Sequence, residues 1–130
     1  LREFIESAGC DPARTVVGGF SQGTMVAVEA LFGMVQRPAG MLLFSGAIIA
    51  ADRWAGLSRS SDGIISGLDV AAYHGEEDPV LAFAAGRAMA GVLEDAGAHV
   101  EFTAFHGGHG IPASLFESAR RHLRRMLALG

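Results

Sequence analysis

Short apolar runs alternate along this chain with longer segments in which apolar residues recur at helical spacing. Four short runs predict strands, at residues 15–20, 41–44, 68–73 and 99–105. Four longer segments predict helices, at residues 1–8, 22–35, 81–95 and 112–129. Alternation of strands and helices is typical of a parallel sheet covered by helices, so we predict an α/β fold.

One stretch, residues 51–67, follows neither pattern. It is polar and irregular, and Trp54 is its one large side chain. We therefore expect a loop or a short cap segment here, with Trp54 as its anchor. The segment at 22–35 is the opposite case, because it is apolar nearly all round and predicts a buried helix.

Size and charge narrow the class of protein. The chain has 130 residues, which suits a single domain spanning 1–130. Half of its residues are hydrophobic, yet no apolar run approaches the roughly 20 residues that span a bilayer. The net charge of −4 does not suggest a nucleic-acid-binding surface. We therefore expect a globular protein without a membrane span.

Cysteine usage and the first residues bear on location. Cys10 is the single cysteine, so no intrachain disulfide can form, and a reducing compartment fits. Residues 1–6 lack the basic and then apolar pattern of a signal peptide, and we expect a cytoplasmic protein. The chain begins with Leu1 instead of Met, so we also expect it to be a piece of a longer protein.

The most specific local motif is Gly19-Phe20-Ser21-Gln22-Gly23, at the junction of a predicted strand and a predicted helix. A serine on such a tight turn can present its hydroxyl at the edge of the sheet, as in a nucleophile elbow. We expect both flanking glycines to sit where a side chain would crowd neighbouring backbone. The motif alone recurs by chance, so its meaning depends on which acid and histidine accompany it.

Candidate partners for Ser21 follow later strands. Asp78 lies in the loop after the third predicted strand, and His109 in the loop after the fourth. The carboxyl ends of parallel strands lie at one edge of a sheet, where sites form in open α/β folds. A serine hydroxyl needs an imidazole to accept its proton, and a carboxylate to orient that imidazole. The order serine, acid, histidine is that of α/β-hydrolases.

Other assignments of these residues remain open at this point. Glu76 and Glu77 compete with Asp78 as the acid, and His106 and His74 compete with His109 as the base. The glycines at 18–23 match neither a P-loop, which needs lysine, nor a dinucleotide fingerprint. The histidines lie on glycine-rich loops, which does not favour a metal centre. We expect no cofactor and no metal.

Four motifs together resemble the phospholipase/carboxylesterase family, which includes acyl-protein thioesterases. They are Gly-Phe-Ser-Gln-Gly at 19–23, Ser45-Gly46, His74-Gly75-x-x-Asp78-Pro79-Val80 and Gly108-His109-Gly110-Ile111. The resemblance implies a three-layer α/β-hydrolase fold that cleaves carboxylic esters or thioesters without a cofactor. It also implies Ser21 as nucleophile, Asp78 as orienting acid and His109 as base. Trp54 could then line an acyl pocket or simply anchor its segment.

The resemblance covers the C-terminal half of the family only. The leading strands are absent, and with them the His-Gly loop that contributes to the oxyanion hole in the family. The backbone N–H of Gln22 is the one oxyanion donor that the motif supplies. Because losing one such donor costs roughly a hundred- to a thousand-fold in rate, we expect this chain alone to be a poor enzyme.

A second hypothesis concerns association. Without the leading strands, the strand at Thr15–Phe20 has one side unpaired, and such an apolar edge is prone to pairing with another chain. The missing N-terminal half or a second copy of the chain could cover it. The chain would then be a non-catalytic fragment that associates through this edge. The arginines at 120, 121, 124 and 125 are expected to form a solvated face, with an anion-binding patch as the alternative.

Overall fold

The computed structural model describes residues 2–60 and 63–129, with side chains except those of residues 2 and 57–60. Four strands form one sheet: β1 (Val16–Phe20), β2 (Gly40–Phe44), β3 (Asp69–Gly75) and β4 (His99–Phe105). They are hydrogen-bonded in the order β1-β2-β3-β4, and every neighbouring pair is parallel. This confirms the four predicted strands and the parallel α/β arrangement.

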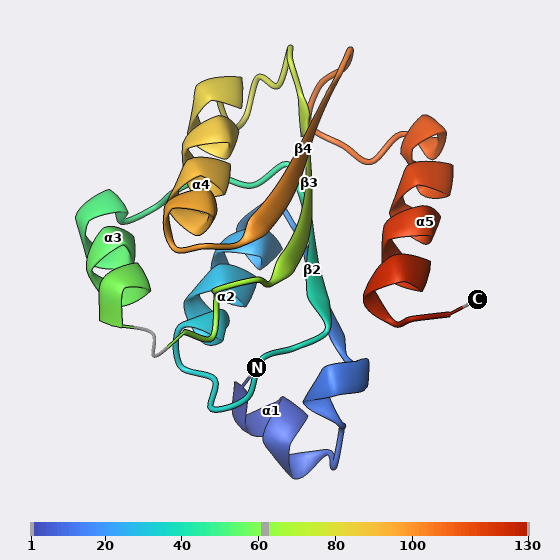
Figure 1. The fold of residues 1–130 in the computed structure, drawn as a ribbon. Coiled ribbons are helices and arrows are strands. Elements are labelled where there is room, and N and C mark those ends of the chain that lie inside the picture. The colour runs from blue at the N-terminus through green and yellow to red at the C-terminus, as the bar shows by residue number, and fades with distance from the viewer. Residues whose placement is uncertain (1, 61–62, 130) are drawn as a thin grey trace.

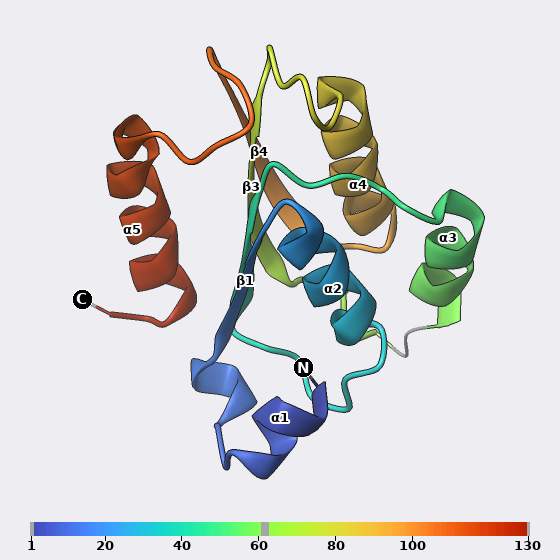
Figure 2. The same ribbon diagram turned by 180° about the vertical axis from the view of Figure 1, so that it is seen from behind.

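Helices cover both faces of the sheet and make three layers (Figure 1). The helices are α1 (Arg2–Ser7), α2 (Gln22–Leu31), α3 (Ala51–Ser60), α4 (Phe83–Asp95) and α5 (Phe116–Met126). Single 3-10 turns at Pro12–Arg14 and Ala113–Leu115 precede β1 and α5. Helices α2, α3 and α4 lie on one face and α5 lies alone on the other, as the view from behind also shows (Figure 2).

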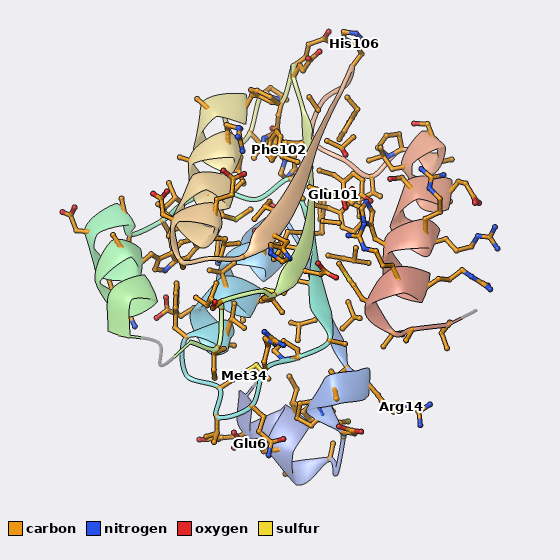
Figure 3. The ribbon with its side chains drawn as sticks, viewed as in Figure 1. Glu6, Arg14, Met34, Glu101, Phe102 and His106 are labelled. Carbon is orange, nitrogen blue, oxygen red and sulfur yellow. The ribbon has the colours of Figure 1, made fainter. Side chains whose placement is uncertain are left out.

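Alternation along the strands fills two cores. The larger core, between the sheet and α2, α3 and α4, includes Met41, Leu43 and Val70. The smaller one, under α5, includes Leu42 and Ala71. The two-residue period of a strand sends successive side chains to opposite faces, which explains how adjacent residues serve different cores. Figure 3 shows the same alternation in β4, where Glu101 and Phe102 lie on opposite sides of the strand.

Two sequence expectations were wrong in their details. The stretch expected to be a loop or cap contains the helix α3, which runs from Ala51 to Ser60. Trp54 is fully buried there, and its indole Nε1–H donates to Glu29 Oε2 of α2 over 2.8 Å. Its ring also lies 6.2 Å from that of Phe32. Packing of this one side chain against α2 holds a helix whose own residues give a weak periodic signal.

Helix α2 is shorter and less enclosed than expected. It ends at Leu31, four residues before the predicted end, and Gly33 closes the turn by donating to Ala30 O. One face, with Ala27, Val28 and Leu31, is buried. Val26 on the other face is 53% exposed. The helix is therefore half covered by the residues that the structure describes.

Strand β1 forms the edge of the sheet next to α2. Within the described part of the chain it pairs with β2 alone. Its burial is mixed, whereas six of the seven residues of β3 are buried. Figure 2 shows β1 at the open side of the sheet. Across the described helices, none has the length and apolar character needed to cross a lipid bilayer.

Candidate active site

Ser21 occupies the turn between β1 and α2, in a strained conformation. Its φ of 54° and ψ of −122° lie in a region that non-glycine residues rarely adopt. The turn is held at both ends: the Ser21 N–H donates to Phe44 O at 2.9 Å, and its carbonyl accepts from the Thr24 Oγ1–H at 2.6 Å. These bonds fix the backbone so that the hydroxyl stands at the carboxyl edge of the sheet.

The two glycines beside Ser21 have different environments. A Cβ on Gly19 would lie 2.6 Å from the nitrogen of Thr24 and closer still to Gly23, so only glycine fits. A Cβ on Gly23 would meet no atom within 4 Å among the described residues. The expectation that both positions are crowded is therefore correct for Gly19 and wrong for Gly23.

Asp78 is fixed in the loop that follows β3. Its Oδ1 accepts hydrogen bonds from the backbone N–H groups of Val80 (2.8 Å) and Leu81 (2.9 Å). Its side chain is fully buried. Burial alone would raise the pKa of Asp78, but the hydrogen bonds from His109 and from these two N–H groups outweigh it. The pKa of Asp78 therefore lies below its ordinary value.

His109 connects the acid to the serine. Its Nδ1 lies 2.7 Å from Asp78 Oδ2, and its Nε2 lies 2.9 Å from Ser21 Oγ. An ionised carboxylate can only accept, so Nδ1 carries the hydrogen and Nε2 is free to accept from the serine hydroxyl. The side chain is 16% exposed, and the ring of Phe20 lies 5.0 Å away. Three residues separated by up to 88 positions thus form one continuous hydrogen-bonded chain.

Close approach of the two loops makes this arrangement possible. The Glu76 N–H donates to Phe105 O at 2.9 Å, and the Glu77 N–H donates to Gly107 O at 3.1 Å. A Cβ on Gly75 would lie 2.9 Å from the carbonyl carbon of Gly107, so glycine is required at this crossing. The loop of Asp78 is therefore tied to the loop of His109 by backbone bonds.

The residues that competed with Asp78 and His109 in the sequence have other contacts. His106 and Glu76 form an exposed pair, with 2.8 Å between Nδ1 and Oε2. Figure 3 places His106 at the far tip of the loop beyond β4. His74 is buried, with 3.4 Å between its Nε2 and Asp78 Oδ2. The structure thus brings Ser21, Asp78 and His109 together, pairs His106 with Glu76 at the surface, and leaves His74 in contact with Asp78.

Gln22 is the first residue of α2. At that position its N–H has no acceptor within the helix, and the positive end of the helix dipole favours a negative charge nearby. This is suitable for an oxygen that becomes negatively charged beside Ser21. It is one donor, supplied by the elbow itself.

An open cavity of about 600 Å³ begins at Gln22 and follows the exposed face of α2. Met25, Val26 and Ile49 give it apolar walls, and Glu3 and Glu29 add carboxylates. Trp54 is not among the residues that line this cavity, and it is buried between α3 and α2 as a packing anchor.

Among the described residues, the side chains that could ligate a metal are dispersed, and two of the arginines of α5 are paired with carboxylates. No group of three or more His, Cys, Asp or Glu side chains converges within residues 2–60 and 63–129. Arg120 pairs with Glu117 on the surface of α5, and Arg125 pairs with Glu101 of β4. These pairs match the expected solvated face of that helix.

His74, which contacts Asp78, was considered from the sequence only as an alternative to His109 as the base. His74 is 1% exposed, and its Nε2 lies 2.9 Å from Leu81 O, within the loop that holds Asp78. The only signal in the sequence was the spacing of His74 and Asp78 around a strand end. That spacing does not say which way the ring points.

Comparisons with known proteins agree on the family and the fold. The model of the phospholipase/carboxylesterase family matches residues 2–127. Acyl-protein thioesterase 1 of Gibberella zeae is 28% identical over 128 residues, covering 98% of this chain and 54% of the relative. A probable carboxylesterase of Oryza sativa subsp. japonica is 28% identical over 125 residues, covering 95% and 52%. The chain therefore spans about half the length of the curated relatives it matches.

Solved structures give the same picture. The structure of Arabidopsis thaliana SOBER1 superposes with a TM-score of 0.81 at 22% identity, covering 97% of this chain and 60% of the other. Esterase PE8 superposes with a TM-score of 0.80 at 28% identity, covering 96% and 56%. The sheet and helices described above thus match a portion of the larger α/β fold of each of these proteins.

Proposed function

The chain belongs to the phospholipase/carboxylesterase family of α/β-hydrolases, and on that premise we propose that it is the catalytic part of a serine hydrolase for carboxylic esters or thioesters. The observation that supports this most strongly is the hydrogen-bonded chain Asp78–His109–Ser21, with distances of 2.7 and 2.9 Å. The substrate would be a small-molecule ester or an acyl thioester.

The proposed reaction begins with acyl transfer. Ser21 Oγ attacks the carbonyl carbon while His109 Nε2 accepts the hydroxyl proton. Asp78 stabilises the imidazolium that results, because its carboxylate faces Nδ1. The oxyanion of the tetrahedral intermediate accepts a hydrogen bond from the N–H of Gln22. When the intermediate collapses, the alcohol or thiol leaves with the proton from His109.

Hydrolysis of the acyl-enzyme reverses these roles. His109 Nε2 accepts a proton from water, the water oxygen attacks the acyl carbon, and the proton returns to Ser21 Oγ as the carboxylic acid leaves. Gln22 again faces the oxyanion. With one donor in place of two, we expect acylation by this chain to be about a hundred- to a thousand-fold slower than in a hydrolase that supplies both donors.

A fluorophosphonate probe tests the proposal, because it labels activated serines covalently. We expect labelling of the full-length gene product at Ser21 and none in Ser21→Ala. Thr24→Val is not suitable as a control because it removes a bond of the elbow, whereas Ser7→Ala lies on exposed α1 and is suitable. Equal labelling of Ser21→Ala and its parent would contradict the proposal.

A second candidate function is association through the edge of β1. It is supported by the pairing of β1 with β2 alone among the described residues, and by the exposure of Phe20 (40%) and Val26 (53%). An N-terminal half of the protein or a second copy could pair there. A monomeric mass in solution, together with efficient turnover of p-nitrophenyl esters by the chain alone, would rule this out. A cytoplasmic location stays a prediction that rests on the single cysteine, Cys10, and on the pattern of residues 1–6.

A further inference from the structure

His74 is a buried titratable residue that the proposed reaction does not use. It lies near the end of β3 and its side chain is 1% exposed. By contrast, His99 and His106 are 75% and 91% exposed, and each pairs with a carboxylate at the surface. Burying an imidazole is unfavourable unless its polar atoms are satisfied, so its contacts indicate its role.

The ring nitrogen Nε2 of His74 faces two oxygens. It lies 2.9 Å from Leu81 O and 3.4 Å from Asp78 Oδ2. A carbonyl oxygen only accepts, so Nε2 carries a hydrogen and donates it to Leu81. Asp78 Oδ2 is the same oxygen that faces His109 Nδ1 at 2.7 Å. The Nε2–H of His74 therefore faces the carboxylate oxygen of Asp78 that orients His109.

Leu81 couples His74 to Asp78 a second time. Its N–H donates to Asp78 Oδ1 at 2.9 Å, while its carbonyl accepts from His74. Moving the Leu81 peptide would therefore disturb one hydrogen bond of the carboxylate directly. Both oxygens of Asp78 thus depend on where the imidazole of His74 lies.

Helix α4 fixes that imidazole. A Cβ on Gly86 would lie 2.7 Å from His74 Cε1, so the helix backbone lies against the ring. The ring of Phe83 meets it edge-on at 5.9 Å. The imidazole is therefore packed against α4 while its Nε2 faces Leu81 and Asp78.

Resting on the proposed function, we propose that His74 is a positioning residue for the acid. Its Nε2–H holds Leu81 and faces Asp78 Oδ2, so that the carboxylate stays aligned with His109. It touches no substrate atom in this role, and it acts through Asp78 alone.

Two pairs of variants of the full-length gene product test this. His74→Phe removes the donor and keeps a ring, whereas His74→Gln keeps an N–H donor near the Nε2 position. Gly86→Ala presses on the imidazole without removing any donor, and Gly91→Ala is its matched control. Gly91 lies on the same helix, and a Cβ there would meet no atom within 4 Å among the described residues.

The first measurement does not depend on catalysis. In protein labelled with ¹⁵N-histidine, we expect a downfield, exchange-protected Nδ1–H signal from His109 bonded to Asp78, assigned by its absence in His109→Gln. It should be lost or broadened in His74→Phe and Gly86→Ala, and retained in His74→Gln and Gly91→Ala. An unchanged signal in both of the first two variants would overturn the proposal.

The second measurement is the rate of fluorophosphonate labelling and the kcat for an ester, each compared with the melting temperature. We expect His74→Phe and Gly86→Ala to lower kcat by roughly 10- to 100-fold with KM little changed, since a small misplacement of a catalytic group has effects of that size. His74→Gln should recover most of the rate. If kcat follows only the melting temperature, the positioning role is wrong. If the parent is not labelled at all, the proposed function fails, and the His109 signal still decides the role of His74.

Discussion

The two ends of the sheet differ in how completely the described residues surround them. At the β3–β4 end, the strand β3 is buried almost throughout, and the loops of Asp78 and His109 are tied by backbone hydrogen bonds. At the β1–α2 end, β1 pairs on one side, and Val26 on α2 is 53% exposed. The loop of Asp78 thus follows an interior strand and is tied by backbone bonds, and we call this the closed end of the sheet, although β4 beside it is an edge strand with mixed burial. Ser21 follows the edge strand β1, and we call this the open end. The difference indicates that the positions of Asp78 and His109 are set mainly by the β3–β4 end.

The largest expected effect is at that closed end. Asp78→Asn keeps the shape of the side chain but presents an amide in place of the carboxylate that holds His109 Nδ1–H. We expect labelling of Ser21 in the full-length gene product to slow by about 10⁴-fold, as when the acid of such a triad is neutralised. The matched control is Glu76→Gln, which removes a surface carboxylate of the same loop and should leave the rate within a factor of two or so. Similar losses in both variants would contradict the assignment of Asp78.

The same substitution has a consequence for stability at low pH. The pKa of Asp78 is lower in the folded chain than its ordinary value of about 3.9. The unfolded chain therefore binds more protons here, and the stabilisation is present above that value and is lost as pH falls through the folded pKa. Urea titrations between about pH 5 and pH 2 should show a shallower decline for Asp78→Asn than for the parent. An equally steep decline in the two proteins would show that Asp78 does not contribute to the loss of stability at low pH.

The glycines beside Ser21 test the open end. Gly19→Ala places a Cβ against the backbone of Gly23 and Thr24, and we expect it to destabilise the chain by about 3 kcal/mol. Gly23→Ala meets open space among the described residues, so it should change stability of the chain by no more than about 1 kcal/mol. Urea unfolding of both variants gives the comparison.

Repeating the Gly23→Ala measurement in the full-length gene product sharpens the comparison. If another segment packs against the elbow there, the substitution should be clearly more destabilising than in this chain alone. Equal effects in the two proteins would mean that the Gly23 side of the elbow is open in both.

His122 tests whether a buried residue near the closed end lowers the stability of the chain. It lies on the buried face of α5, and its Nδ1 has no hydrogen-bond partner within the part of the chain that the structure describes. Burial lowers its pKa, so the unfolded chain binds a proton more readily than the folded one. Stability should therefore decline as pH falls through the ordinary histidine pKa of about 6.5.

We expect His122→Phe to stabilise the chain by about 1 kcal/mol, because it removes an unsatisfied buried nitrogen. It should also flatten the pH dependence of urea unfolding between about pH 7 and pH 5. His99→Phe is the exposed control, since that ring is 75% exposed. A loss of stability in His122→Phe would mean that the imidazole makes a favourable bond.

The smallest expected effect on stability is at Val26. Because this side chain is 53% exposed on α2, Val26→Glu should change the free energy of unfolding by about 0.5 kcal/mol or less. If the open end associates with a second copy, the same charge should shift the mass in solution toward the monomer. Ala88→Glu, at an exposed position of α4, is the control for one added negative charge. An unchanged oligomer in Val26→Glu would exclude this face from the contact.

Much of the fold follows from local pattern. The strand at 99–105 was predicted with its observed bounds, because its alternation of polar and apolar residues matches the period of a strand. Helix α4 was predicted within two residues at its start and at its observed end, where Gly97 has a φ of +97°. Helix α3 was missed because the burial of Trp54 and its bond to Glu29 come from a different segment.

The sequence by itself determined which residue types were available for a site and the order in which they follow strands. It narrowed the candidates for the acid to three carboxylates and the candidates for the base to three histidines. The family motifs then favoured Asp78 and His109. Only the tertiary structure decided that Asp78 Oδ2, His109 and Ser21 Oγ lie within hydrogen-bonding distance, and that Glu76 pairs with His106 instead. It also decided that Gly23 is open and that His74 faces Asp78. Local pattern encodes periodicity and turns, whereas the distance between side chains depends on how loops far apart in the chain are packed together.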